Sequence, residues 1–350
     1  MGGCGIGIRE LTDSVKEKAL ELGFSRVGIT TCDDFSDYER DVVSRGDDYA
    51  WYRQNPSLAF PGAHPRDLFP EGKSIIVTAY GFGRFAYPER LAKHIGRAYL
   101  SRSYSPLPES IHALRVSAFR GFLESLGMKV YGQHDRIPAR EAGVRAGVVT
   151  YGNNNFAFTE EDGSFIILYT FIVDAELEYD PPSPGDICPE GCTLCRDACP
   201  THALEAPGHL KPGRCILKIN IAGAPDLAMA DSVGERIHGC DACQEACPRN
   251  RAVMEKATVR DPFVDRMAEL FDLERILFLD DGYYDRVVRP LMYNYIRDLE
   301  VFRRNAAVAM GNSGDEGYLS ALERASSEYT GTPVAEAANW AIAKLRSRVE

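Results

Sequence analysis

The 350-residue sequence lacks the features that mark membrane and secreted proteins. It has no run of about 18 apolar residues, so no transmembrane helix is expected. Segment 1–24 lacks the charged region and apolar stretch of a secretory signal, and no twin-arginine export signal occurs. The sequence therefore predicts a cytoplasmic protein that makes no contact with a membrane.

The sequence also lacks a cluster of basic residues. Its 40 Lys and Arg are scattered among 51 Asp and Glu, and its net charge is −11. Proteins that bind nucleic acids through phosphates usually carry a basic stripe, so this composition disfavours a nucleic-acid partner. No G-x-G-x-x-G follows a predicted strand, and GFGRF at 81–85 is too short, so the sequence contains no nicotinamide-binding fingerprint.

The first half of the sequence alternates predicted helices and strands. Helical spacing of apolar residues and terminal glycines predict helices at 10–23 and 110–126. Short apolar segments predict strands at 27–29 and 128–132, and continuous apolar runs predict buried strands at 74–82 and 165–173. This alternation predicts an α/β domain over residues 1–180.

The second half of the sequence divides at a proline-rich linker. PPSPGD at 181–186 marks this boundary, and a cysteine-rich domain is predicted over 181–255. From Pro262 onwards the pattern is helical. RRNAAVAMGNSG and PVAEAANWAIAKLRSR are expected to form helices of a stacked hairpin in a helical domain over 256–350.

Eight of the ten cysteines fall in the cysteine-rich segment, which favours metal ligation because disulfides are disfavoured in a reducing compartment. Seven of them form two runs, CPEGCTLCRDACP and GCDACQEACPRNR, and the last cysteine of each run is followed by proline. This ending is typical of two-cluster ferredoxins, in which the last cysteine of each run ligates the other iron–sulfur cluster. The first cluster is then expected to use Cys188, Cys192, Cys195 and Cys247.

The second predicted cluster needs a ligand from outside both runs. Cys199, Cys240 and Cys243 supply three thiolates, and Cys215 in KPGRCILK is the remaining cysteine nearby. The alternative is two structural zinc sites, which favour paired C-x-x-C knuckles. One departure is that three residues, instead of two, separate Cys188 from Cys192. Cys4 and Cys32 are expected to be free thiols.

Several motifs are spread over nearly the whole length of the chain: HPRDLFPEGKSIIVTAY, DRIP, EEDGSFIILYTFIVD, RCI, GCDACQEACPRNR and RRNAAVAMGNSGD. With these motifs the chain resembles the epoxyqueuosine reductases, cobalamin-dependent enzymes of tRNA queuosine synthesis. Reductive dehalogenases are related to this family. The resemblance implies a nitroreductase-like, cobalamin-binding α/β core, a ferredoxin-like module with two 4Fe–4S clusters, and a HEAT-like helical C-terminal domain.

The resemblance implies a redox reaction at cobalt. A low-potential donor of the ferredoxin or flavodoxin type supplies electrons, and the clusters reduce cob(II)alamin to cob(I)alamin, which drives removal of an epoxide oxygen or similar leaving group. Asp135, in the family's D-x-x-P motif, is expected to donate the proton. Its alternative role is that of a turn residue before proline. The sequence has no D-x-H-x-x-G, the motif that supplies a histidine ligand in other cobalamin proteins.

The residues expected near cobalamin depart in part from the family pattern. Tyr104, in SRSYSPL, matches a catalytic tyrosine near the cofactor, with a packed core aromatic as the alternative. Gly152 and Asn153 occupy the place of the family's Trp-x-Gly-Lys element, and Leu217 follows RCI where the family has Ser-Tyr. Together with Tyr104 and Asp135, these three residues (Gly152, Asn153 and Leu217) are expected to bind the cofactor.

Three functions remain open from the sequence. Full-length resemblance favours reduction of epoxyqueuosine in tRNA. The altered pocket and the apolar stretch VVRPLMYNYIRDLEVFRR, basic in the family, favour a relative acting on a small molecule in the manner of reductive dehalogenases. The third function is non-catalytic electron transfer that activates another protein's corrinoid, and it would not need Asp135.

Overall fold

The computed structural model describes residues 7–104, 106–131, 136–185, 187–221, 227–292 and 296–347. The chain folds into two compact units. The N-terminal unit comprises Met1–Gly83 and Pro108–Cys192, and the C-terminal unit comprises Arg84–Leu107 and Thr193–Glu350.

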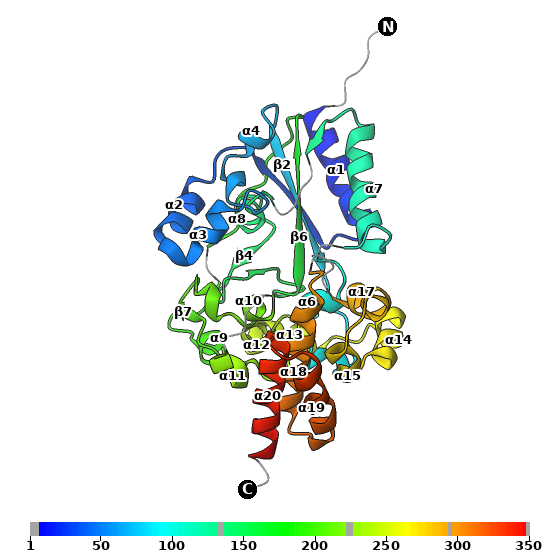
Figure 1. Cartoon of the computed structure of the whole chain (residues 1–350). Helices are drawn as coiled ribbons and strands as arrows, with labels where there is room; N and C mark the ends of the chain where they lie inside the picture. Colours follow the sequence, from blue (N-terminus) through cyan, green and yellow to red (C-terminus); the bar gives the residue numbers. More distant parts are fainter. Residues whose placement is uncertain are drawn as a thin grey trace. The chain divides into compact units, whose positions relative to one another are not determined.

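The N-terminal unit is built around a four-stranded sheet in the order β1-β2-β6-β3. Helices α1 and α7 lie side by side on one side of this sheet, and α8 lies on the other (Figure 1). The three pairs of neighbouring strands are all antiparallel. The alternation of helices and strands in the sequence did not determine this strand direction. The elements are α1 (Ile8–Glu21), β1 (Arg26–Thr31), β2 (Ser74–Gly81), α7 (Ile111–Ser125), β3 (Val130–Tyr131), α8 (Ala139–Arg145) and β6 (Ile166–Val173).

Helices on both faces explain why β2 reads as a continuous apolar run. Every residue of β2 is buried. Val77 and its alternate neighbours pack in a core with residues of α8, whereas Tyr80 contacts His112 of α7 with ring centroids 5.0 Å apart. The strands expected at 74–82 and 165–173 are thus confirmed as β2 and β6.

The two long helices end where the sequence predicts. Gly23 follows the last turn of α1 with φ 86°, and Gly127 follows α7 with φ 85°. Glycine adopts this left-handed conformation at little energetic cost, and a residue in it turns the chain away from the helix axis and so ends the helix. At the other end of α7, the Ser110 hydroxyl accepts a hydrogen bond from the Ala113 N–H at 3.2 Å, a standard N-cap.

The close packing of β1 against the end of α8 depends on Gly28. A Cβ at this position would lie 2.1 Å from the Ala146 carbonyl oxygen, a backbone atom. We expect Gly28→Ala to lower the free energy of unfolding by about 1–3 kcal/mol, because the core must shift to accept the methyl group. Chemical denaturation followed by circular dichroism measures this loss.

Gly121 is the matched control for this substitution. It lies in α7, and a Cβ there would meet nothing within 4 Å. We expect Gly121→Ala to raise stability by about 0.5–1 kcal/mol, because glycine is costly inside a helix. Equal stability of the two variants would contradict the packing argument.

The remaining short elements of the N-terminal unit connect its strands and long helices. They are α2 (Ser36–Ser44), η1 (Gly46–Tyr49), α3 (Ala50–Gln54), η2 (Pro61–Ala63), α4 (Pro65–Leu68), β4 (Thr150–Tyr151) and β5 (Ala157–Phe158). Strands β4 and β5 pair in a separate two-stranded sheet.

The C-terminal unit includes a segment that we expected in the α/β domain. Arg84–Leu107 carries α5 (Glu89–Ala92) and α6 (Arg97–Leu100). Parallel bridges join Phe85 to Val259 and Ile95 to His238, and Ile95 is 1% exposed in the core of this unit. Local sequence patterns do not reveal that this segment packs in the C-terminal unit, because the residues it pairs with lie more than 140 residues away in the sequence. The division at residues 180 and 255 remains a prediction.

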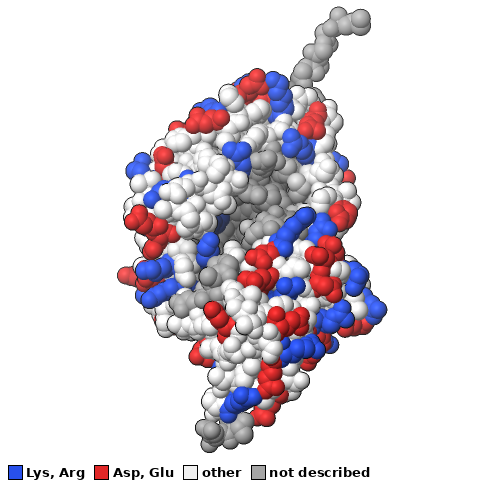
Figure 2. All heavy atoms as spheres, in the orientation of Figure 1, with Lys and Arg blue, Asp and Glu red and all other residues white. Residues whose placement is uncertain are grey.

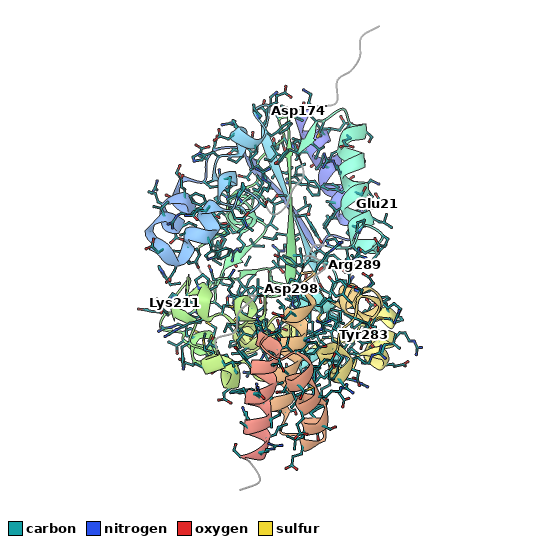
Figure 3. All side chains as sticks on the ribbon, in the orientation of Figure 1. Glu21, Asp174, Lys211, Tyr283, Arg289 and Asp298 are labelled. Carbon is teal, nitrogen blue, oxygen red and sulfur yellow. The ribbon has the colours of Figure 1, made fainter. Side chains whose placement is uncertain are left out.

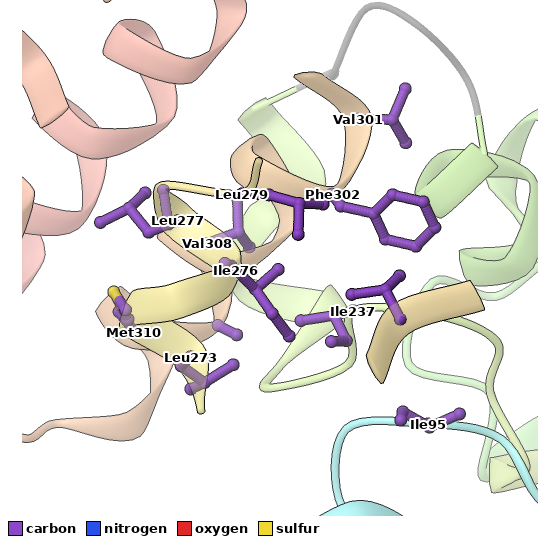
Figure 4. Packing of buried hydrophobic residues seen from close by; sticks show 14 of the residues in the cluster. Ile95, Ile237, Leu273, Ile276, Leu277, Leu279, Val301, Phe302, Val308 and Met310 are labelled. Atoms are coloured by element: carbon purple, nitrogen blue, oxygen red, sulfur yellow. The ribbon is translucent and has the colours of Figure 1, made fainter. Parts of the chain in front are cut away.

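The rest of the C-terminal unit is mainly helical, and its large apolar core is drawn in Figure 4. Helices α18 and α20 match the two helices expected from RRNAAVAMGNSG and PVAEAANWAIAKLRSR. Helix α20 packs against both α18 and α19. Among the described residues, no helix is long and apolar enough to span a membrane. The elements are α9 (Leu194–Asp197), β7 (Leu204–Ala206), β8 (His209–Leu210), η4 (Pro212–Arg214), α10 (Ile216–Ile221), η5 (Leu227–Met229), α11 (Ala230–Val233), α12 (Ala242–Glu245), α13 (Pro248–Glu255), α14 (Pro262–Leu270), α15 (Leu273–Leu277), α16 (Asp281–Tyr283), η6 (Tyr284–Val288), α17 (Arg289–Leu291), α18 (Leu299–Ser313), η7 (Glu316–Tyr318), α19 (Leu319–Glu328) and α20 (Pro333–Arg346).

Candidate metal centre

The two cysteine runs fold in the same way. Helix α9 begins two residues after Cys192, and α12 begins two residues after Cys240. Each helix has four residues, and the two helices pack against each other. The Cys-Pro pairs follow at Cys199 and Cys247. This internal repeat is the arrangement expected of a module that holds two clusters.

Four cysteines from three segments of the C-terminal unit come close together. Cys243 is close enough to Cys240, Cys215 and Cys199 for its thiolate to be repelled by theirs. Cys215 also interacts with Cys199, and Cys240 with Cys215. The hairpin of β7 and β8 separates Cys199 from Cys215 in the chain, and α10 begins directly after Cys215. These are the four thiols expected to hold the second cluster.

Three of these four thiols have raised pKa values. Burial raises the pKa of Cys215, raises that of Cys240 to about 11, and raises that of Cys243 furthest, and repulsion from neighbouring thiolates adds to each. Burial also acts on Cys199, but hydrogen bonds from the Thr201 hydroxyl and from backbone N–H groups outweigh it, so its pKa is lowered.

This donor set fits an iron–sulfur cluster. Cluster ligation requires thiolates, and positive iron among the four sulfurs would offset both their burial and their mutual repulsion. Within the described residues, no three Cys, His, Asp or Glu side chains are grouped as they would be around a single metal ion.

The first predicted set of ligands is divided between the two units. Cys188 and Cys192 end the N-terminal unit, whereas Cys195 and Cys247 belong to the C-terminal unit. The Asn153 backbone N–H donates to the Cys188 sulfur at 3.3 Å, and the Asn153 side-chain amide donates to the Cys192 carbonyl at 3.3 Å. The loop after β4 therefore holds the start of this run. Ligation of one cluster by all four cysteines remains a prediction.

The residues expected near cobalamin lie in different surroundings. Asn153 contacts the cysteine run, and Gly152 packs against Phe158, whose ring would lie 2.5 Å from a Cβ at that position. Leu217 packs against the core of the C-terminal unit. The ring of Tyr104 is 41% exposed and meets Tyr99 edge-on, with centroids 5.9 Å apart.

The assignment of these residues to cobalamin remains a prediction. Gly152 and Asn153 belong to the N-terminal unit, and Tyr104 and Leu217 belong to the C-terminal unit. The proposed proton donor, Asp135, lies outside the described residues.

The two cysteines outside the cluster segment are separate from these sets. Cys4 lies outside the described residues. Cys32 is a free, fully buried thiol in the N-terminal unit, as expected, and burial raises its pKa to about 11. A buried thiol that keeps its proton is a structural residue.

His238 is a candidate site residue that our sequence analysis did not identify. It is fully buried two residues before Cys240, and its ring lies 4.2 Å from that of Tyr99. Neither ring nitrogen has a hydrogen-bond partner among the described residues, and burial lowers the pKa of His238 to about 3. Buried polar atoms normally have partners. Its position beside a predicted ligand was the available sequence signal.

A cavity of about 370 Å³ in the C-terminal unit is lined in part by Cys240, one of the second set of cysteines. Cys240 and Asp241 form part of its wall, together with Lys93, Glu235 and Arg236. Lys93 and Glu235 form an ion pair of 2.9 Å at this site. The cavity therefore presents charges of both signs next to a predicted cluster ligand.

Comparison with known proteins supports the metal centre and the fold. Residues 188–250 match the model of the 4Fe-4S double cluster binding domain. Epoxyqueuosine reductase of Vibrio cholerae is 28% identical over 324 residues, which cover 87% of this chain and 84% of that protein. Epoxyqueuosine reductase of Escherichia coli is 29% identical over a match 369 positions long, and the match covers 98% of this chain and 92% of that protein.

Solved structures give the same result. The crystal structure of epoxyqueuosine reductase with an epoxyqueuosine-modified tRNA stem loop has a TM-score of 0.81 at 25% identity, covering 97% of this chain and 91% of that one. The structure from Bacillus subtilis has the same TM-score, identity and coverage. The chain is therefore similar to the epoxyqueuosine reductases in sequence and in fold over nearly its whole length, as its motifs predict.

Proposed function

We propose that this chain is an iron–sulfur reductase of the epoxyqueuosine reductase type. It takes electrons singly from a low-potential ferredoxin or flavodoxin, passes them through two 4Fe–4S clusters, and removes the epoxide oxygen of epoxyqueuosine in tRNA with cobalamin as cofactor. The observation that carries this proposal is the closeness of Cys215 to Cys199, Cys240 and Cys243.

Cys215 separates this chain from a simple two-cluster electron carrier. In such a carrier the two cysteine runs complete both clusters by themselves. Here the second run has three cysteines, and Cys247 is assigned to the first cluster, so the second cluster needs a thiolate from RCI. That arrangement accompanies the full-length similarity to epoxyqueuosine reductases.

The reaction sets what the chain must supply. Removal of an epoxide oxygen as water takes two electrons and two protons, and clusters carry electrons one at a time. Cobalamin, when bound, would supply a strong reductant to the substrate. We assign Tyr104 to contact it, because its ring is 41% exposed. Asp135 would hold the proton that is delivered to the leaving oxygen.

The cavity beside Cys240 is the proposed point of electron entry. It brings solvent close to a predicted ligand of the second cluster. A donor protein that covers the cavity would therefore lie a short distance from that cluster, as electron transfer requires. We therefore place the ferredoxin or flavodoxin over this cavity, where Lys93 and Arg236 lie among the acidic residues Glu235, Asp241 and Glu245.

Two of the four arginines of segment 287–304, which corresponds to the family's basic stretch, are engaged within the protein. Arg304 is buried, and Arg303 donates to the Leu279 carbonyl. Arg289 and Asp298, labelled in Figure 3, place opposite charges in the same segment. On the face drawn in Figure 2, acidic and basic side chains are interspersed. Recognition of the tRNA would then depend more on its modified base than on its backbone charge.

Reconstitution without oxygen tests the proposed function. We expect the full chain, treated with iron and sulfide, to bind about eight irons, to take up hydroxocobalamin and to convert a tRNA stem loop that carries epoxyqueuosine. Visible spectra measure the cofactors, and mass spectrometry of the base measures turnover. Affinity for the stem loop should fall as salt rises.

The same experiment distinguishes the other functions. A stem loop without the modification is the control and should remain unchanged. Clusters without cobalamin uptake would indicate an electron-transfer protein. Full cofactor loading with turnover of a small halogenated or epoxide compound, and none of the stem loop, would indicate the small-molecule enzyme.

A further inference from the structure

The metal centre does not use the motif RRNAAVAMGNSGD, which forms most of α18. Within it, Arg304 is 1% exposed and Asn305 is 4% exposed. Polar side chains at such depth destabilise a protein unless hydrogen bonds satisfy them. Their partners therefore indicate what the motif does.

Arg304 binds the helix that follows Cys215. Its Nη2 donates to the Ile219 carbonyl oxygen at 2.8 Å. Ile219 lies one helical turn beyond Cys215, and its N–H donates back to the Cys215 carbonyl at 3.0 Å. Arg304 thus fixes α10 one helical turn away from the predicted ligand Cys215.

Arg304 also orients the neighbouring amide. Its Nε and Nη2 donate to Asn305 Oδ1 at 3.0 and 2.7 Å. Because this oxygen accepts both bonds, the side-chain NH2 group of Asn305 is directed to other acceptors. The two residues therefore act as one unit.

Asn305 ties together the two segments that carry Cys215 and Cys240. Its Nδ2 donates to the Asn220 carbonyl and to the Ile237 carbonyl, both at 2.8 Å. Asn220 lies five residues after Cys215, and Ile237 lies three residues before Cys240. Among the described residues no strand pairing joins these two segments, so this amide, together with the Asn220 side chain that donates to the Arg236 carbonyl at 3.3 Å, sets their spacing.

We propose that Arg304 and Asn305 are positioning residues for the second cluster, and that Arg304 is also a buried cation that favours its reduced form. This inference rests on the proposed function, because it requires that Cys199, Cys215, Cys240 and Cys243 hold a cluster. Reduction adds an electron to an anionic cluster, and a guanidinium bonded to Ile219, one helical turn beyond Cys215, would stabilise the added charge.

The charge of Arg304 persists at neutral pH. Burial lowers its pKa to about 10, against the opposing effects of Asp298 and Glu300. The residue therefore remains a cation throughout the range in which the clusters would work.

The chain provides matched controls on the same helix. Arg303 precedes Arg304, but its guanidinium donates to the Leu279 carbonyl, in a segment without cysteines. Asn312 donates to the carbonyls of Ala230 and Gly234, at 2.9 and 2.8 Å. Both controls remove a comparable side chain without touching α10 or Ile237.

The experiment compares reconstituted full-length variants by iron content, electron paramagnetic resonance and midpoint potential. We expect Asn305→Ala to lose one cluster, so that iron falls from about eight to about four per chain, whereas Asn312→Ala keeps both. We expect Arg304→Met to keep both clusters with a lower midpoint potential for one of them. Arg304→Lys should restore that potential, and Arg303→Met should leave it unchanged.

The outcomes separate this inference from the proposed function. If the wild-type chain binds no clusters, the proposed function fails first. If it binds both, an unchanged potential in Arg304→Met, or an equal shift in Arg303→Met, would overturn the role of Arg304. Full iron content in a folded Asn305→Ala would overturn the role of Asn305. If that variant does not fold, the comparison of the arginine variants still decides.

Discussion

Replacing Cys215 with Ala is expected to remove the second cluster. Iron should fall from about eight to about four per chain, because three thiolates remain where a cube needs four. Loss of a residue that only supports a ligand costs about 10–100-fold in metal affinity or activity, and loss of the ligand itself should cost more. We therefore expect donor-driven turnover to fall by more than about 100-fold. Iron analysis and electron paramagnetic resonance measure the first effect.

Cys32→Ala is the control for the loss of a thiol. Cys32 is fully buried in the N-terminal unit and separate from both cysteine runs. Its replacement should leave iron content and resonance signals as in the wild type. If Cys215→Ala kept all its iron with unchanged spectra, another residue would complete the second cluster. The signal lost in Cys215→Ala also identifies the cluster whose potential Arg304 is proposed to set.

The elements with strong local signals were predictable from the sequence. The buried strands β2 and β6 appeared as continuous apolar runs, and α1 and α7 ended at glycines that adopt positive φ. Strand order was not predictable, because β2 and most of β6 are buried on both faces, so their sequences show no alternation that would indicate register. Packing of Arg84–Leu107 into the C-terminal unit also depends on contacts far apart in the chain.

The cysteines were the most predictable part of the site. Elimination assigns Cys215 to the second cluster, and the structure brings it near Cys199 and Cys243. Ligation of one cluster by these thiols remains a prediction. The position of Asn153 in a family motif assigns it to cobalamin. In the structure it donates hydrogen bonds to the Cys188 sulfur and the Cys192 carbonyl. A sequence motif does not determine which hydrogen-bond partners a polar side chain has in the folded protein.

Buried polar residues were the part that sequence patterns missed. Arg304, Asn305 and His238 are each less than 5% exposed. Charged and amide side chains are usually at the surface, so a pattern-based analysis places them there. Their burial becomes visible only when α18 is seen to be enclosed by the segments that carry the cysteines.

Asp135→Asn is expected to lower turnover by about 10²–10⁴-fold, the usual contribution of a general acid. The amide is close in size to the carboxyl but does not supply its proton. Visible and resonance spectra of the clusters and of bound cobalamin should match those of the wild type. Mass spectrometry of the product base measures the loss, and Asp135→Glu should recover part of the activity.

Asp13→Asn is the matched control, because Asp13 is an exposed carboxylate on α1. It should turn over at the wild-type rate. The comparison also decides between catalysis and electron transfer. A protein that only passes electrons to another protein's corrinoid has no substrate oxygen to protonate, so both variants would reduce such a partner equally well. Normal turnover by Asp135→Asn would remove this residue from the reaction, whereas a selective loss of turnover with intact spectra would place the proton transfer within this chain.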